Sequence, residues 1–236
     1  SGAGGDARAQ HRAGLGQQER AGEIPRRRHR RPGAGVVVER GRPREPDPAA
    51  QRTTSMTEQQ IRLERRSSAY WRVTFDHPPF NIFGPETIPQ MEKVVAEIEA
   101  DPNLRVVVFD SAVPGFFLTH YNFTPKLSES TSLPSGTTGL HPLPDMLVRI
   151  SKAPVVSIAL IRGRATGVGS ELALASDMRF ASREKAILSQ WEVGAGFVPG
   201  GGPMARLPRL MGRGRALEVL LGSDDINGDL AEEYDA

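Results

Sequence analysis

The chain has 236 residues, of which 38% are hydrophobic and 25% charged, the proportions of an ordinary soluble globular protein. It contains no cysteine, which excludes disulfides, a thiolate nucleophile and a cysteine-ligated metal, and fits a reducing compartment such as the cytoplasm. The apolar run at 154–161 is far shorter than the roughly 20 residues that cross a bilayer, so we expect no transmembrane helix and no membrane partner.

Residues 1–55 differ in composition from the rest of the chain. They hold 12 Arg, no Lys and 6 acidic residues, with the run RRRHRR at 26–31 and few apolar residues, which predicts a disordered basic tail. An arm that binds nucleic acid or an anionic membrane is one alternative, and a mitochondrial targeting segment is another that the acidic residues oppose. The interpretation we favour is a start assigned too early, with the protein beginning at Met56 and no nucleic-acid partner.

Elements at the start of the folded part follow from the spacing of apolar residues. Alternation over 61–65 and 70–75 predicts a β-hairpin. Apolar residues at helical spacing predict a helix over 85–100, and 104–109 is predicted to be a buried strand. A strand, helix, strand order indicates a parallel crossover, and such sheets bind ligands beyond the carboxyl ends of their strands.

The middle of the chain alternates loops with one predicted helix. The loop HPPFNIFG at 77–84 cannot be helical at its two prolines. The segment 116–123 carries His120, which could be a hydrogen-bonded bystander or a proton carrier. Because this histidine is alone, we favour the bystander. Ser, Thr, Gly and Pro without periodicity predict a mobile loop over 127–140, and apolar spacing predicts a helix over 143–150.

The segment from 154 to 175 predicts a strand, a glycine-bearing turn and a helix. The free amides of the first helical turn, from Gly167 onward, would lie at the carboxyl end of the strand 154–161, where they attract developing negative charge. A phosphate-binding loop is opposed by Glu171, which would repel a phosphate, and a dinucleotide fingerprint lacks its third glycine at Leu172. The amides better suit a carbonyl that becomes an oxyanion during reaction.

Two carboxylates come from neighbouring predicted elements. Glu171 lies in the first turns of that helix, and Glu192 follows the extended piece 186–190. If hydrophobic neighbours such as Trp191 and Phe197 raise one pKa, the pair can act as acid and base near neutral pH. The alternative is that Glu171 only stabilises a helix N-terminus and Glu192 is solvated, and spacing alone favours this alternative.

Several motifs in order carry a family resemblance. They are IRGRATGVGSELALASDMRFAS from 161, QWEVGAGFVPGGGPMARLPRLMG from 190, HPPFN at 77–81, VVVFDS at 106–111 and GFFLTHYN at 115–122. From about Ile61 onward the chain resembles the crotonase family of enoyl-CoA hydratases and isomerases. The resemblance implies an α/β fold, a spiral of repeated ββα units over 56–236, and assembly as a trimer or dimer of trimers. It also implies an acyl-CoA substrate, with no metal and no cofactor besides the CoA of that substrate.

The same resemblance implies a role for particular residues. Glu171 and Glu192 match the two catalytic glutamates, and the backbone amides of Tyr121 and Val168 match the oxyanion hole. The matched substrate-binding positions are Asn122, Phe123, Gly167 and Trp191. Valine at 168 replaces the family's usual glycine, tyrosine at 121 a small residue and asparagine at 122 an aspartate, and the larger side chains would narrow the acyl site.

The expected activity is therefore the addition of water to an enoyl-CoA. The alternatives are double-bond isomerisation, which one carboxylate can manage, and a non-catalytic chain, because the family continues into C-terminal helices beyond Ala236 and this chain would be truncated. Two short helices are predicted over 204–211 and 215–221. Their arginines, 206, 209, 213 and 215, are expected to be mostly solvated, with one available to a CoA phosphate.

Overall fold

A computed structural model describes residues 58–125 and 127–235, so the predicted basic tail lies outside the described residues. A first sheet has the strand order β1-β2-β3-β5-β7. Its strands are β1 (Ile61–Arg65), β2 (Tyr70–Phe75), β3 (Val106–Ser111), β5 (Val156–Ile161) and β7 (Met178–Ala181). The first two pair antiparallel and the others parallel, which confirms the predicted hairpin and the predicted crossover.

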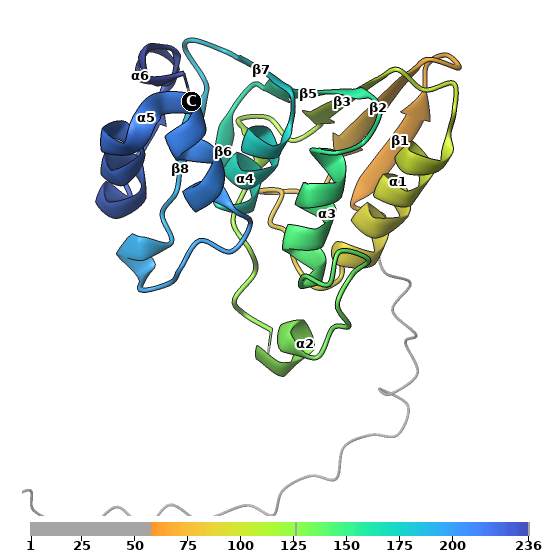
Figure 1. Cartoon of the computed structure of the whole chain (residues 1–236), viewed down its shortest axis with the longest axis horizontal. Coiled ribbons are helices and arrows are strands. Elements are labelled where there is room, and N and C mark those ends of the chain that lie inside the picture. The colour runs from red at the N-terminus through yellow and green to blue at the C-terminus, as the bar shows by residue number, and fades with distance from the viewer. Residues whose placement is uncertain (1–57, 126, 236) are drawn as a thin grey trace, which may run out of the picture. The chain divides into compact units, whose positions relative to one another are not determined.

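A second, smaller sheet has the order β4-β6-β8-β9. Its strands are β4 (Phe116–Leu118), β6 (Arg164–Thr166), β8 (Ile187–Ser189) and β9 (Ile226–Asn227). Along the chain, β3, β5 and β7 of the first sheet each pass directly into a strand of the second sheet, and helical segments follow these pairs (Figure 1). This repeat of strand, strand and helix is the predicted α/β spiral.

Helices α1 (Ile88–Ala100) and α4 (Val168–Ala175) pack against the first sheet, and α3 (Pro142–Ile150) packs between these two helices (Figure 1). Helix α1 buries Ile88, Met91, Val95 and Ile98, the apolar side that its sequence predicted. It begins three residues later than predicted because a turn precedes it, in which the amide of Thr87 donates to the carbonyl of Gly84 at 2.9 Å.

The segment 127–140 was predicted to be a mobile loop, but it begins with the short helix α2 (Leu127–Thr131). Local polar contacts order this region. The Tyr121 hydroxyl is 3.0 Å from the Ser130 hydroxyl, and the ring of His141 lies 2.9 Å from the Ser130 carbonyl. Further along, the buried carboxylate of Asp145 accepts hydrogen bonds from the amide and hydroxyl of Thr138. Periodicity does not report such contacts, so the sequence did not predict the helix.

The C-terminal part contains α5 (Pro203–Gly222), η2 (Val193–Ala195) and α6 (Gly228–Tyr234). Helix α5 is broken at Gly212, whose φ of 78° is not helical, so the two predicted helices are confirmed as two arms of one bent element. Strand β9 and helix α6 were not predicted, because each is too short to show a period. No helix within 58–125 and 127–235 is long and apolar enough to span a membrane.

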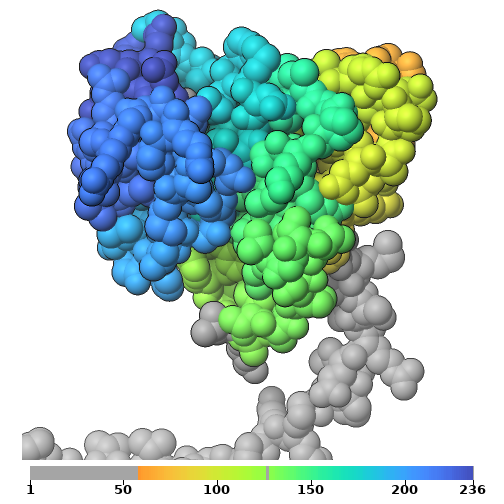
Figure 2. All heavy atoms as spheres, in the orientation of Figure 1, coloured from red at the N-terminus to blue at the C-terminus, as the bar shows by residue number. Residues whose placement is uncertain are grey.

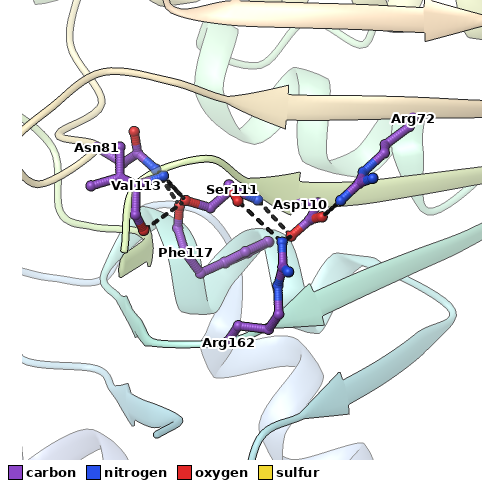
Figure 3. A network of polar contacts seen from close by, with 7 residues as sticks. All are labelled: Arg72, Asn81, Asp110, Ser111, Val113, Phe117 and Arg162. Atoms are coloured by element: carbon purple, nitrogen blue, oxygen red, sulfur yellow. Dashed lines mark hydrogen bonds and ion pairs between the residues drawn. The ribbon is translucent and has the colours of Figure 1, made fainter. Parts of the chain in front are cut away.

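A polar network ties the strand ends of the two sheets together (Figure 3). The fully buried carboxylate of Asp110 ends β3 and binds Arg72 of β2 and Arg162, which follows β5, the latter at 2.6 Å. Beside it, the amide of Asn81 donates to Ser111 Oγ and to the carbonyl of Phe117, both at 2.8 Å. The loop 77–84 is thereby fixed against the start of β4.

Candidate active site

Glu171 lies in the first turn of α4, a helix whose eight residues are all buried. Its side chain is only 2% exposed, and Oε1 accepts a hydrogen bond from the amide of Gly201 at 2.6 Å. A side chain at position 201 would displace this carboxylate, because a Cβ on Gly201 would stand 2.3 Å from Glu171 Oε2. Backbone of the glycine-rich run 200–202 therefore lies directly against the carboxylate of Glu171.

Glu192 reaches the same place from a neighbouring strand. Strands β6 and β8 are parallel partners, and β6 leads through Gly167 into α4 while β8 leads into Glu192. The position of a Cβ on Gly167 would be 3.1 Å from Glu192 Oε1, and the charge of Glu192 acts on Glu171. Since Glu192 is only 8% exposed, the interpretation of a solvated side chain is wrong.

Burial controls the ionisation of both carboxyl groups. It raises the pKa of Glu171 to about 7, helped by the charge of Glu192 and opposed by the hydrogen bond from the Gly201 amide and by Arg206. Burial also raises the pKa of Glu192. Two neighbouring carboxyls whose pKa values are both raised can hold one proton between them, so one can accept a proton while the other donates.

Two backbone amides lie beside this pair. The amide of Val168 belongs to the first turn of α4, where N–H groups have no partner within the helix. Tyr121 pairs with Phe83, but the bonds of that bridge use the carbonyl of His120 and the amide of Asn122, so the Tyr121 amide faces the other side.

Close backbone packing brings together Gly167 and His120, the residues that precede these two amides. A Cβ on Gly167 would be 3.1 Å from the α-carbon of His120, and one on Gly169 would be 1.8 Å from the carbonyl oxygen of Leu118. Only glycine at both positions lets the start of α4 lie directly on the end of β4. Gly167 contacts His120, and the next residue after each of them, Val168 and Tyr121, carries one of the two amides.

Aromatic side chains form one wall of the site. Phe123 stacks on Phe197 with ring centres 4.8 Å apart and meets Trp191 edge-on at 5.8 Å. Next to this wall is a pocket of about 530 Å³, lined by Tyr121, Asn122, Phe123, Leu143, Phe197 and Gly200 among others. Figure 2 shows the segments that contribute these residues, around α3 and before α5, side by side on one face.

His120 and Asn122 are placed at the site without a proton-transfer contact. The His120 ring meets Trp191 edge-on at 5.2 Å, burial lowers its pKa, and within 58–125 and 127–235 no hydrogen bond reaches the ring. Its predicted role as a bystander therefore rests on packing and not on a hydrogen bond. The side chain of Asn122 accepts from the amide of Thr124 at 3.0 Å and so shapes the local turn.

The arginines of α5 do not act as one cluster. Arg206 is half-buried and donates to the carbonyl of Gly201 at 2.5 Å, so it holds the backbone that binds Glu171. Arg215 covers the ring of Tyr234 instead. Because Arg209, Arg213 and Arg215 are exposed, the expectation of a mostly solvated set is confirmed, with Arg206 as the exception. In the described part of the chain, no three His, Asp or Glu side chains are grouped to hold a metal ion.

Known proteins are similar to this chain in sequence and in fold. The sequence model of the family described as enoyl-CoA hydratase/isomerase matches residues 65–234. The mouse mitochondrial enoyl-CoA hydratase domain-containing protein 2 is 33% identical over 153 residues, covering 65% of this chain and 51% of that protein. The short-chain-enoyl-CoA hydratase of Clostridium acetobutylicum is 31% identical over 163 residues, covering 67% and 60%. The chain thus spans about half to three fifths of the length of these curated relatives.

Solved structures agree. A candidate enoyl-CoA hydratase from Streptomyces avermitilis is 42% identical, with a TM-score of 0.69, over 75% of this chain and 63% of that chain. An enoyl-CoA hydratase from Geobacillus kaustophilus is 26% identical, with a TM-score of 0.67, over 75% and 66%. The family model matches most of the length of this chain, the fold is the ββα spiral, and the motifs stand in family order. This chain therefore belongs to the enoyl-CoA hydratase/isomerase, or crotonase, family.

Proposed function

We propose that the chain is an enoyl-CoA hydratase-type enzyme that adds water across the α,β double bond of an acyl-CoA thioester. The observation that carries this proposal is the meeting of two buried carboxyls, Glu171 and Glu192, beside the backbone amides of Tyr121 and Val168. Hydration needs a proton acceptor, a proton donor and a site for negative charge on oxygen, and this arrangement can supply all three.

In the proposed reaction, the amides of Tyr121 and Val168 bind the thioester carbonyl oxygen. The carboxylate of the pair takes a proton from water, whose oxygen bonds to the β-carbon while the π electrons move toward the carbonyl. The enolate oxygen is then stabilised by the two amides. The protonated carboxyl delivers its proton to the α-carbon, and the pair recovers its starting state by passing one proton between its members.

The remaining predicted positions shape the substrate site in this proposal. Gly167 gives the close approach at the start of α4, and Asn122, Phe123 and Trp191 border the acyl group. The aromatic wall and the pocket of about 530 Å³ support an acyl chain of limited size or with an aromatic ring. CoA enters as part of the substrate, with no further cofactor, and we propose that the chain acts as a homo-oligomer, a trimer or dimer of trimers as in the resemblance.

Isomerisation is the second candidate, because a carboxyl with a pKa of about 7, like Glu171, can by itself remove and return a proton. The two reactions are separated by following crotonyl-CoA hydration and the conversion of 3-hexenoyl-CoA to its 2-enoyl isomer. We expect hydration to be the faster of the two.

The roles of the glutamates are tested with Glu171→Gln and Glu192→Gln, each of which should lower the hydration rate by at least about a hundredfold. Glu129→Gln, at an exposed carboxylate on α2, is the matched control and should keep full activity. Equal turnover in all four proteins would contradict the proposed function, and absence of turnover in the unmodified chain would favour a non-catalytic member of the family.

A further inference from the structure

Three buried polar atoms in the candidate site have no hydrogen-bond partner. They are Gln190 Oε1, Trp191 Nε1 and Glu192 Oε2, which belong to three successive residues directly after β8. In the described residues the one other such side-chain atom is Arg72 Nε. Buried polar atoms in folded proteins are nearly always paired, so the unpaired atoms of the neighbouring residues Trp191 and Glu192 indicate that a polar group binds beside them.

The indole nitrogen of Trp191 and the carboxylate of Glu192 both lie close to Gly167. The position that a Cβ would occupy on Gly167 is 2.8 Å from Trp191 Nε1 and 3.1 Å from Glu192 Oε1. The next residue of the chain is Val168, whose amide is one of the two proposed oxyanion donors. The indole N–H therefore lies against the backbone at which the thioester is proposed to bind.

The two unpaired groups are chemically complementary to a hydroxyl. An indole N–H can only donate a hydrogen bond, and an ionised carboxylate can only accept one. A hydroxyl or water oxygen can accept from the first and donate to the second at the same time. A carbonyl or an apolar group can satisfy at most one of them, so a water or a hydroxyl group is the ligand that fits.

The indole is also held in place by its ring. His120 meets it edge-on at 5.2 Å, and Phe123 meets it edge-on at 5.8 Å. Rings packed on two sides limit the orientations of the side chain, so the direction of the N–H is set before any ligand enters. A donor that needs no reorientation is what a reaction site gains most from.

Resting on the proposed function, we infer that Trp191 is a catalytic residue whose N–H binds the oxygen of the water that adds to the double bond. The two hydrogens of this water are directed at Glu171 and Glu192, and one lone pair accepts from the indole. The remaining lone pair faces the β-carbon. As the carbon–oxygen bond forms, one water proton passes to the carboxylate, and the indole keeps its hydrogen throughout.

The test compares a reaction that uses water with one that does not. Trp191→Phe keeps an aromatic ring and removes the donor. We expect kcat for crotonyl-CoA hydration to fall at least about tenfold with KM little changed, since the water and not the thioester loses its contact. Exchange of the α-protons of butyryl-CoA in D2O uses the glutamates and the amides but no attacking water, and should keep its rate.

The other tryptophan provides the control. Trp71 is buried in the core, so Trp71→Phe removes an indole away from the site and should leave both rates unchanged. Unchanged hydration in Trp191→Phe, or an equal fall of hydration and exchange, would overturn the role of the N–H while leaving the proposed function standing. Absence of both reactions in the unmodified chain would instead remove the proposed function, and this inference with it.

A binding measurement covers the case in which Trp191→Phe does not fold. Because the chain has two tryptophans, Trp191 is the sole indole in the Trp71→Phe variant. Its emission should shift to longer wavelength with 3-hydroxybutyryl-CoA, whose hydroxyl takes the place of the added water, and shift less with butyryl-CoA. Equal shifts with the two thioesters would overturn the inference.

Discussion

Replacing Glu171 by glutamine tests whether burial controls this carboxyl. The side chain is 2% exposed, and burial raises its pKa to about 7 from an ordinary value of 4.5. A carboxyl whose pKa is raised in the folded state stabilises the fold fully below pH 4.5, and this contribution is lost as the pH rises through about 7. Glutamine has a similar shape and stays neutral, so Glu171→Gln should not show this loss.

The size of the effect follows from the two pKa values. The rise from 4.5 to about 7 spans about 2.5 pH units, and at about 1.4 kcal/mol per unit the ionised carboxyl costs about 3 kcal/mol. Glutamine can still accept from the Gly201 amide, but it loses the strength that charge gives that bond. We therefore expect the free energy of unfolding of Glu171→Gln to be about 2 kcal/mol higher than that of the unmodified chain at pH 8.5. At pH 5 the two proteins should differ little in stability.

The assay is urea unfolding followed by circular dichroism at several pH values from 5 to 8.5. Glu129→Gln, at an exposed carboxylate, is the control and should follow the unmodified chain at every pH. A difference between Glu171→Gln and the unmodified chain that stays constant over this range would refute the reasoning, because a carboxyl that titrates outside the range contributes no pH dependence within it.

The remaining predictions concern packing and the polar network. Gly169→Ala places a Cβ 1.8 Å from a backbone oxygen and should lower the free energy of unfolding by at least about 3 kcal/mol, whereas Gly214→Ala, with no atom within 4 Å, should leave the urea midpoint unchanged or higher. Asp110→Asn should cost about 3 kcal/mol at pH 7. Burial raises the pKa of Asp110, but the hydrogen bonds from Arg72, from the Ser111 amide and from Arg162 together outweigh this and hold the pKa below 3.8, so titration in acid should remove the difference. Asn81→Ala removes three hydrogen bonds and should cost about 2 kcal/mol by urea unfolding and also slow hydration, since its loop pairs with Tyr121.

Local sequence signals predicted most of the elements. The hairpin of β1 and β2, helix α1 and the break of α5 at Gly212 depend on apolar spacing and on one glycine, which a short window of sequence contains. Helix α2 was missed because it is ordered by contacts of Tyr121 and His141 with Ser130, and no periodicity records these contacts.

By itself the sequence determined the family, the order of the elements and the residues able to do acid and base chemistry, because ordered motifs and local periods lie within the chain itself. Only the tertiary structure decided that Glu171 and Glu192 meet, since 21 positions separate them and spacing alone favoured a solvated Glu192. It also decided that the Gly201 amide binds Glu171 and that the Trp191 N–H is buried without a partner among the described residues. Burial and hydrogen bonding belong to atoms brought together by folding, so no reading of neighbours along the chain can assign them.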